Sequence, residues 1–298
     1  MNSESNSLNK NLNIRFSLDQ TLAIIVIYNE TLEFSETLNS INKSNSKNEK
    51  IDVFVYDNTL KKQKFKLKKF NNFNIQYYHD PSNLGISTAY NKGAQIARKM
   101  GKSWLLFLDQ DTNFDINFIE IIKSEINQFS NINLFAPILK LSSNTILSPF
   151  KFKFFHGTHL KDISPGIHDL RICQPINSGI IIKLESFEKT GGYNEKLKLD
   201  FSDHQFLEKF KQIENNFVVI NSIGIQNFSA EETNFNKILS RFKHYCDGVL
   251  NFETKSIINY SFLHFFLILK IFKQTLKHRS FQFFKIYVNK VRNYKSKK

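Results

Sequence analysis

Two aspartates that follow an apolar segment are the side chains in this sequence best suited to chemistry. Asp109 and Asp111 stand two residues apart, directly after the run WLLFL at 104–108. Burial of a carboxylate without a compensating charge is expensive. A hard divalent cation such as Mg²⁺ or Mn²⁺ would neutralise the pair, since these ions favour one or two carboxylates together with substrate phosphates. The same pattern also fits a solvated turn whose aspartates cap the next helix.

The segments around this pair alternate between strand and helix patterns. Short apolar runs predict strands at 22–28, 52–56, 75–79, 104–108 and 134–139. Between them, apolar stripes of helical period predict helices at 31–41, 86–100 and 116–129. This alternation predicts an α/β fold with a mostly parallel sheet and helices on both faces. After an irregular region, we expect a strand at 177–184, a helix at 203–213 and a last strand at 217–220.

Four polar segments follow the first four predicted strands. Ligands of such sheets bind beyond the carboxyl ends of the strands, so these segments should share one rim. They are Tyr28-Asn29-Glu30, Asp57-Asn58, Asn83-Leu84-Gly85 and Asp109-Gln110-Asp111.

In their order and spacing, these segments resemble family 2 glycosyltransferases with the GT-A fold. The residues that carry the resemblance are 22–30, 53–58, 83–93 and 109–111. The acidic segment, read as Leu-Asp-Gln-Asp-Thr, is similar to that of bacterial rhamnosyltransferases in the family. The resemblance covers roughly 21–228. It implies a Rossmann-like GT-A domain at 21–250, between a flexible N-terminus at 1–20 and a basic amphipathic helical tail at 251–298.

The resemblance also implies a donor site for a nucleotide sugar. In it, Tyr28 would stack on the base, Asp57 would accept from a base N–H or a ribose hydroxyl, and Asp109 would face the ribose. Asp111, with Asp109, would bind Mg²⁺ or Mn²⁺ at the diphosphate. The residues expected around the nucleotide sugar are Tyr28, Asn29, Glu30, Asp57, Asn83, Gly85 and Asp109. The residue types alone leave open that Tyr28 is a core aromatic, because the chain has 31 Phe and 10 Tyr.

Inverting sugar transfer needs a further carboxylate that takes the proton of the acceptor hydroxyl. The resemblance places this base at the start of a late helix, where Asp203 matches and Asp200 is the alternative. Asp203 precedes Phe206 and Phe210 by three and seven residues, which predicts an inward-facing position. Alternatively, Ser202 and Gln205 form a capping box and Asp203 only favours the helix dipole.

Two more segments are expected at the acceptor and donor-sugar pocket. Asn177, Ser178 and Gly179 match the strand that lines this pocket in the family, together with Asp200; a plain strand entry is the alternative. Many relatives carry a His after the last strand, near the metal or diphosphate. Here the sequence reads Gln226-Asn227-Phe228. Either Asn227 takes that place or the diphosphate is held otherwise.

The net charge of +14 is concentrated at the C-terminal end. From Lys255 to Lys298 there are eleven Lys or Arg and no Asp or Glu. Two apolar segments in this tail are too short or too interrupted to span a bilayer, and they resemble helices that lie in a membrane surface. We therefore expect a peripheral contact with an anionic membrane; a helix packed on the catalytic domain is the alternative. Nothing resembles a nucleic-acid-binding motif.

The rest of the composition fits a cytoplasmic globular protein. Hydrophobic residues make up 41% and charged residues 23%, which excludes a disordered chain. Two cysteines build no disulfide scaffold, and residues 1–19 contain no apolar core of a signal peptide. We expect the protein at the inner face of the cell membrane.

Together these features predict an inverting, metal-dependent glycosyltransferase of bacterial surface polysaccharide such as O-antigen. Its donor would be a nucleotide-diphosphate sugar, with dTDP-rhamnose as the candidate, and its acceptor a glycan or glycolipid. A nucleotidyltransferase is an alternative, but it needs a Gly-rich triphosphate loop that 28–32 lacks. A non-catalytic, membrane-associated scaffold of the same fold is another; loss of Asp111 or Asp203 would favour it, and both are present.

Overall fold

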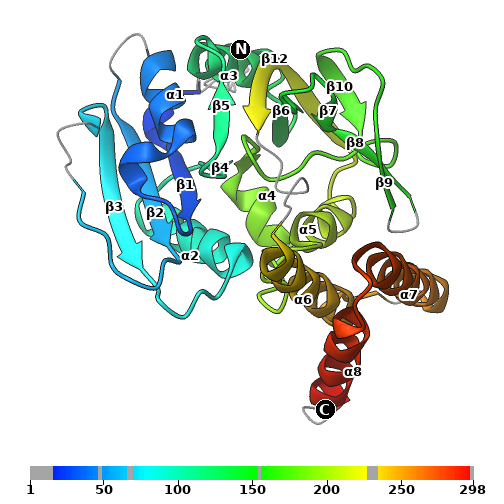
Figure 1. The fold of residues 1–298 in the computed structure, drawn as a ribbon. Coiled ribbons are helices and arrows are strands. Elements are labelled where there is room, and N and C mark those ends of the chain that lie inside the picture. The colour runs from blue at the N-terminus through cyan, green and yellow to red at the C-terminus, as the bar shows by residue number, and fades with distance from the viewer. Residues whose placement is uncertain are drawn as a thin grey trace, which may run out of the picture.

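A ten-stranded mixed sheet runs through the centre of the molecule (Figure 1). The computed structural model describes residues 16–295 except 46–48, 66–69, 154–155, 227–233 and 255. The strands lie in the order β10-β12-β6-β11-β4-β1-β2-β3, with β5 paired to β12 and β7 to β6. Their bounds are β1 Thr21–Ile27, β2 Ile51–Asp57, β3 Phe73–His79, β4 Trp104–Leu108, β5 Thr112–Phe114, β6 Leu134–Lys140, β7 Ile146–Ser148, β10 Gly166–Asp169, β11 Ile181–Lys183 and β12 Asn216–Gln226. A separate hairpin joins β8 (Phe150–Lys153) and β9 (His156–His159).

The first half of the sheet is parallel, as predicted. β1 pairs in parallel with β2 and β4, and β2 pairs in parallel with β3. Every residue of β1 and β4 is buried, because helices cover both faces. The registers Ile27↔Asp57 and Ile25↔Leu108 bring the ends of β2 and β4 beside the end of β1.

The second half of the sheet mixes directions. β11 lies between β4 and β6 and is antiparallel to both, while β12 is parallel to β6. The strand expected at 177–184 is only Ile181–Lys183. Gly179 accounts for the shorter strand, because its φ of +80° is a turn conformation that no strand continues through. The helix expected at 31–41 is likewise divided, since Ser35 caps a new helix by accepting from the Leu38 N–H at 3.2 Å.

Helices cover the two faces of the sheet around two separate hydrophobic cores. α1 (Glu36–Ser44) and α3 (Phe118–Gln128) pack on one face. The opposite face carries α2 (Ile86–Lys99), α4 (Leu184–Lys189) and α5 (Ser202–Phe210). Gly93 allows α2 to lie close to β1, because a Cβ there would stand 2.4 Å from Ile24 Cδ1. Two short 3-10 helices, Leu18–Gln20 and Leu32–Phe34, complete the domain.

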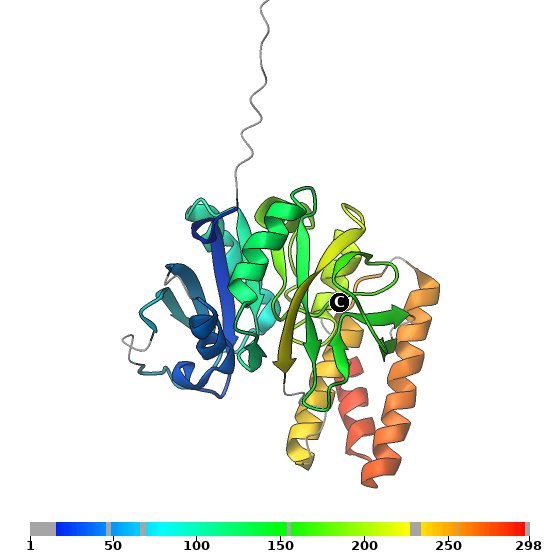
Figure 2. The ribbon, with the colours of Figure 1, turned by 90° about the horizontal axis from the view of Figure 1, so that it is seen from above.

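Three C-terminal helices lie side by side at one edge of the domain (Figure 2). They are α6 (Phe235–Asn251), α7 (Ile257–His278) and α8 (Gln282–Lys295). Phe242, Cys246, Leu267 and Phe283 are buried in a core that these helices share. The helical unit thus begins at α6, before the boundary expected at 251. Within the described residues, no helix is long and apolar enough to span a membrane.

Candidate active site

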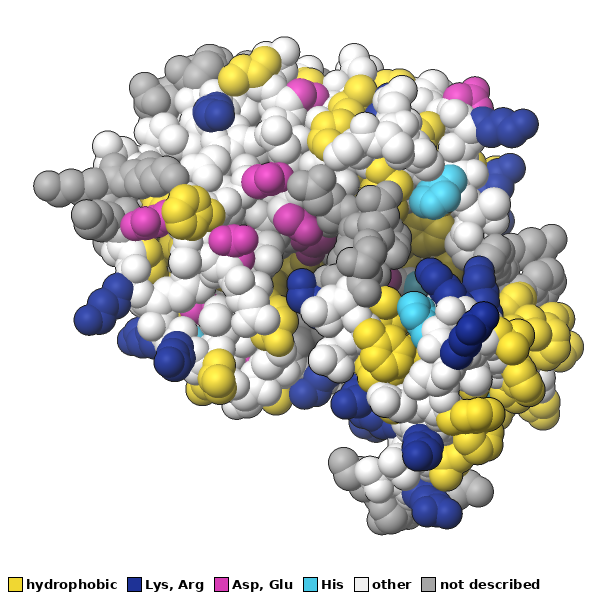
Figure 3. Space-filling view, viewed as in Figure 1, with side chains coloured by type: hydrophobic (Ala, Val, Ile, Leu, Met, Phe, Trp, Pro, Cys, Tyr) yellow, Lys and Arg dark blue, Asp and Glu magenta, His cyan; other side chains and the backbone are white. Residues whose placement is uncertain are grey.

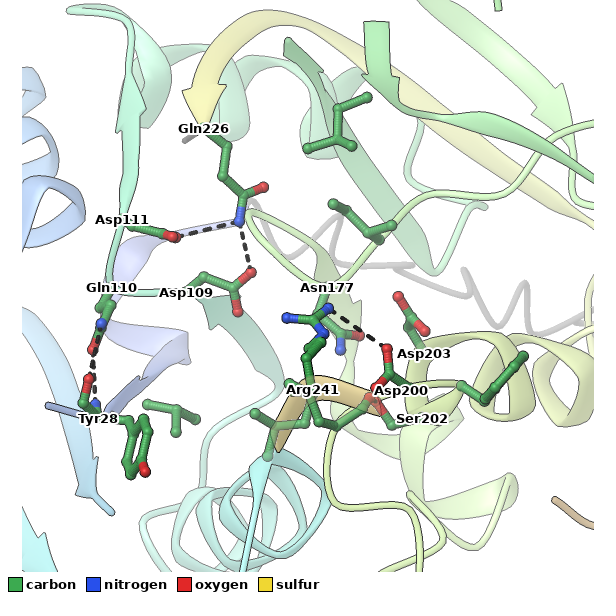
Figure 4. Close-up of a pocket in the computed structure, with 16 residues that line it drawn as sticks. Tyr28, Asp109, Gln110, Asp111, Asn177, Asp200, Ser202, Asp203, Gln226 and Arg241 are labelled. Carbon is green, nitrogen blue, oxygen red and sulfur yellow. Dashed lines mark hydrogen bonds and ion pairs between the residues drawn. The ribbon is translucent and has the colours of Figure 1, made fainter. Parts of the chain in front are cut away.

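A pocket of about 340 Å³ opens where β1 and β4 end (Figure 4). Residues from both halves of the domain and from α6 line it. They are Val26, Tyr28, Ile86, Asp109, Gln110, Asp111, Leu147, Ile176, Asn177, Leu199, Asp200, Phe201, Ser202, Asp203, Gln226 and Arg241. The pocket therefore unites Tyr28, the acidic pair and the segment around Asp203, as the strand-end rule and the resemblance predicted together.

The ends of β1 and β4 are tied to each other at this pocket. The Tyr28 N–H donates to Gln110 Oε1 at 2.8 Å, and Gln110 Nε2 donates back to the Tyr28 carbonyl at 3.1 Å (Figure 4). The Tyr28 side chain is 49% exposed, so the interpretation as a core aromatic is wrong. An exposed aromatic ring at a pocket wall can stack on a planar ligand.

Asp109 and Asp111 converge on one side chain from β12. Gln226 Nε2 donates to Asp109 Oδ2 at 3.0 Å and to Asp111 Oδ1 at 3.3 Å (Figure 4). A hydrogen bond from Tyr90 reaches the other Asp109 oxygen at 3.4 Å. The acidic pair is therefore directed into the pocket and held by neutral donors. It does not cap α3, which begins at Phe118, so the capping alternative is wrong.

Burial and mutual repulsion make this pair costly to ionise. Burial raises the pKa of Asp109 to about 7, and the nearby charges of Asp111 and Asp203 add to the rise. Burial also raises the pKa of Asp111. These are the effects expected for carboxylates that lack a cationic partner in a confined site.

The donor set at this position fits a hard divalent cation. Gln226 Oε1 has no hydrogen-bond partner in the part of the chain that the structure describes, and rotation of the amide would turn this oxygen toward the two carboxylates. Oxygen donors of this kind suit Mg²⁺ or Mn²⁺. Among the described residues, no group of three or more His, Cys, Asp or Glu could hold a metal.

Asp203 enters the pocket from the first turn of α5, on the side opposite Asp111 (Figure 4). The capping box considered for this helix is absent: Phe201 is the N-cap residue, in a left-handed conformation, and no side chain caps the helix. The Ser202 hydroxyl donates instead to the Leu199 carbonyl at 2.8 Å. Phe206 and Phe210 are buried, as expected. The capping interpretation is therefore wrong.

The surroundings of Asp203 bring its pKa near neutrality. Burial raises the pKa of Asp203 to about 6, the charge of Asp200 adds to the rise, and the His204 N–H and Arg241 oppose it. Asp200 itself forms an ion pair with Arg241 at 3.5 Å. A carboxylate with a pKa just below working pH is ionised and still basic enough to accept a proton.

Seven of the expected site residues do not line this pocket, and Asn29 and Glu30 are two of them. Asp57 is buried, with its carboxylate accepting from Thr59 and the Tyr77 hydroxyl. Ser178 bonds the Thr112 hydroxyl at 2.7 Å, beneath Asp109. The others are Asn83, Gly85 and Gly179. For Asp57 and Asn83, a role in nucleotide binding stays a prediction.

The two glycines of this group serve tight packing. A Cβ on Gly85 would stand 2.3 Å from the Lys198 carbonyl oxygen, and one on Gly179 would stand 2.6 Å from Pro137 Cγ. Gly179 therefore packs against protein, which contradicts the close approach of a ligand expected there. Asn29 lines a neighbouring pocket, and Glu30 accepts from the Thr31 N–H. Asn177 lines the first pocket as predicted.

Two pocket residues had no role in the sequence interpretation. Gln226 ends β12, and Asn227, the residue considered in its place, lies outside the described residues. The strand expected at 217–220 stops before Gln226, so no sequence signal indicated that this side chain ends a strand. Arg241 lies on α6, and its sequence surroundings give no sign that it reaches the acidic pocket. Close packing brings it there: a Cβ on Gly248 of the same helix would stand 2.9 Å from the Asp200 carbonyl oxygen.

Comparisons with known proteins agree with this arrangement. The model of the family described as "Glycosyl transferase family 2" matches residues 22–165, which contain β1 to β4 and the acidic pair. Residues 22–165 thus match a family 2 glycosyltransferase domain, over slightly less than half of the chain. No curated protein matches the chain.

Solved structures of S. aureus TarS share the fold of this glycosyltransferase domain. TarS 1-349 in complex with UDP-GlcNAc matches with a TM-score of 0.55 and 15% identity, over 92% of this chain and 80% of that chain. A longer TarS structure matches with a TM-score of 0.53 and 17% identity, over 83% of this chain. This chain spans 42% of the longer TarS chain. At these identities the similarity concerns the fold, which is GT-A.

Proposed function

We propose that the protein is an inverting glycosyltransferase that takes its sugar from a nucleotide-diphosphate donor. One observation carries the proposal: a single pocket of the family 2 domain holds an acidic pair at the end of β4 and, facing it, the carboxylate of Asp203. The pair suits the donor diphosphate, and the separate carboxylate suits the acceptor. Both alternatives, a nucleotidyltransferase and a non-catalytic scaffold, lack such a specific observation.

In the proposed reaction, the acceptor hydroxyl oxygen forms a bond to the anomeric carbon while the bond from that carbon to the diphosphate oxygen breaks. Asp203 accepts the hydroxyl proton, and the nucleoside diphosphate leaves with the electron pair of the broken bond. Tyr28 would stack on the base. Arg241 positions Asp200 through their ion pair and lowers the pKa of Asp203, which keeps this base ionised.

Asp109 and Asp111, with the Gln226 carbonyl oxygen, would hold a Mg²⁺ or Mn²⁺ ion. A cation in that place supplies Lewis-acid stabilisation of the diphosphate leaving group. Without it, Gln226 keeps the two carboxylates together through its amide hydrogens.

The finer substrate assignment rests on sequence resemblance. The Leu-Asp-Gln-Asp-Thr segment favours rhamnose from dTDP-rhamnose, and the acceptor would be a bacterial surface glycan or glycolipid. The fold shared with TarS in complex with UDP-GlcNAc adds that nucleotide sugar to the candidates.

We also propose that α7 rests on an anionic membrane surface at the cytoplasmic face. Leu263, Leu267 and Ile271 of α7 are buried against α6 and α8. The opposite face exposes an apolar stripe at helical spacing: Ile258, Phe262, Phe265, Leu269, Phe272 and Leu276. Hydrophobic side chains gather over α7 in Figure 3, with Lys and Arg beside them. A helix that is apolar on both faces requires a second apolar environment.

Charge complementarity favours lipid as that environment. The segment from Lys255 onward contains eleven cations and no acidic residue. Each Lys or Arg near an anionic leaflet contributes about 1 kcal/mol. The apolar stripe would lie among the lipid headgroups while the cations meet the lipid phosphates.

A panel of nucleotide sugars, each with and without Mn²⁺, tests the proposed activity. Ligand binding to the native state raises the melting temperature by mass action. We expect one nucleotide class to stabilise the protein in a metal-dependent way, and that donor then to be consumed with a lipid-linked acceptor. Failure of every nucleotide sugar to shift the melting temperature would contradict the proposal.

A further inference from the structure

A second cavity adjoins the candidate active site, on the side of the C-terminal helices. It has a volume of about 640 Å³ and lies between α6, α7 and the loop before α5. Its lining shares Tyr28, Leu199, Asp200 and Arg241 with the first pocket. The two cavities are therefore adjacent, and the residues between them separate the second cavity from Asp203.

The two cavities differ in the sign of their charge. The first is lined by four aspartates and one cation, Arg241. Among the described residues, the second is lined by three cations, Lys237, Arg241 and Lys270, and by one carboxylate, that of Asp200. An anion is therefore favoured in the second cavity and disfavoured in the first unless a metal is bound there.

Lys270 is a partly buried cation at the wall of the second cavity. It is half-buried on α7, and its Nζ lies 3.4 Å from the centroid of the Tyr245 ring. In the described part of the chain, this ammonium group contacts the ring rather than an acidic side chain. Burial lowers the pKa of Lys270, and the charge of Asp200 opposes this shift. A bound anion would compensate the burial of this charge.

Three side chains of the same cavity contain a buried polar atom without a hydrogen bond in the described structure. Gln274 Oε1, His244 Nδ1 and Asp200 Oδ2 are buried and have no hydrogen-bond partner among the residues that the structure describes. All three side chains line the second cavity. Such atoms cost free energy unless a ligand or water satisfies them. Two of them are oxygen acceptors, which match the hydroxyl groups of a polyol or a sugar.

We propose that the second cavity binds the acceptor, and that the acceptor is a hydroxylated phosphate ester whose phosphate meets Lys270. Its hydroxyl groups donate to Asp200 and Gln274, and the chain of the acceptor passes the residues between the two cavities and extends into the first pocket toward Asp203. The inference rests on the proposed function and adds a substrate class to it. The phosphate can belong to a polyol or sugar phosphate or to the headgroup of a lipid.

Calorimetry on the full chain tests this assignment with three probes: glycerol phosphate, glycerol, and vesicles of phosphatidylglycerol. Each is titrated into the wild type, Lys270→Met, Lys270→Arg and the matched control Lys273→Met, which removes an exposed cation from the same helix. Loss of one charge-assisted contact should weaken binding of a phosphate probe by about tenfold in Lys270→Met. Lys270→Arg should restore much of it, Lys273→Met should bind as the wild type does, and glycerol should not bind.

Binding of the nucleotide found by the donor panel is measured on the same samples. It confirms that each variant is folded, and it separates the two proposals, because Lys270 does not line the first pocket. Lys270-dependent binding of either phosphate probe supports the inference and identifies the source of the phosphate. If nucleotide binds but neither phosphate probe does, or if both bind Lys270→Met as tightly as the wild type, the acceptor assignment is overturned and the donor site stands. If no nucleotide binds, the proposed function fails whatever the phosphate probes show.

Discussion

Replacement of Asp203 by Asn tests the proposed base most directly. The change keeps the shape of the side chain and removes its ability to accept a proton. General-base catalysis contributes roughly 10²- to 10⁴-fold, so turnover should fall by that factor. The donor-side residues Tyr28, Asp109 and Asp111 are untouched, so nucleotide binding should stay within about twofold of the wild type. Release of nucleoside diphosphate, coupled to a spectroscopic assay, measures the rate.

The pH dependence of the wild type carries a second, independent signature. The base works when deprotonated, so activity is present above its pKa and lost as the pH falls through it. With the pKa of Asp203 at about 6, the ionised fraction is about nine-tenths at pH 7 and about one-tenth at pH 5. The acidic limb of kcat/KM should therefore drop roughly tenfold over that interval. A base with the ordinary aspartate pKa of about 3.9 would lose only about a tenth of its activity there.

Asp200→Asn is the matched control, because Asp200 is the alternative base. The charge of Asp200 raises the pKa of Asp203, so its removal should shift the acidic limb to lower pH and retain substantial turnover. A loss of 10²-fold or more in Asp200→Asn, together with near-normal turnover in Asp203→Asn, would assign the base to Asp200. An acidic limb that persists near pH 6 in the residual activity of Asp203→Asn would assign that limb to another group, such as Asp109.

Three further predictions follow from other parts of the structure. Asp111→Asn should abolish metal-dependent binding of nucleoside diphosphate in calorimetry; unchanged, metal-dependent binding would rule out the acidic pair as the metal site. Gly93→Val places a Cβ 2.4 Å from Ile24 Cδ1, so it should lower the free energy of unfolding by about 1–3 kcal/mol. Denaturant titration measures this loss. The control Gln95→Val, at an exposed position of the same helix, should lower the free energy of unfolding by well under half as much. The double variant Phe265→Glu and Phe272→Glu should no longer co-sediment with anionic vesicles, whereas the control Ile116→Glu on the catalytic domain should still do so. High salt should release the wild-type protein from the vesicles only in part. Equal sedimentation of all three proteins would contradict the membrane proposal.

Local pattern was sufficient to predict much of the fold. β1 and β4 are continuous apolar runs, and α2 carries an apolar stripe that ends at its basic last turn. Each of these signals depends on residues close in the chain, so sequence reading recovers it. The acidic pair was predictable for the same reason, because it directly follows β4.

Side chains brought in by tertiary packing were not predictable in this way. Arg241 reaches the pocket because Gly248 lets α6 approach the backbone of Asp200. Asp57 lies at the end of its strand as expected. Its carboxylate, however, accepts hydrogen bonds from the Thr59 N–H and from the Tyr77 hydroxyl on the neighbouring strand. Neither outcome is visible in spacing, because both depend on contacts between distant segments.

The insertion of β11 between β4 and β6 bears on the order in which the site is built. Strand pairing there joins Leu106 to Ile181, partners 75 positions apart in the chain. Contacts between such distant segments carry a large loop-closure cost and form slowly. Asp109 follows β4 and precedes β11 in the chain, whereas Asp203 comes after β11. A chain emerging from the ribosome therefore exposes Tyr28, Asp109 and Asp111 first, and it gains the proposed base Asp203 and the Gln226 amide only after β11 has been made and paired.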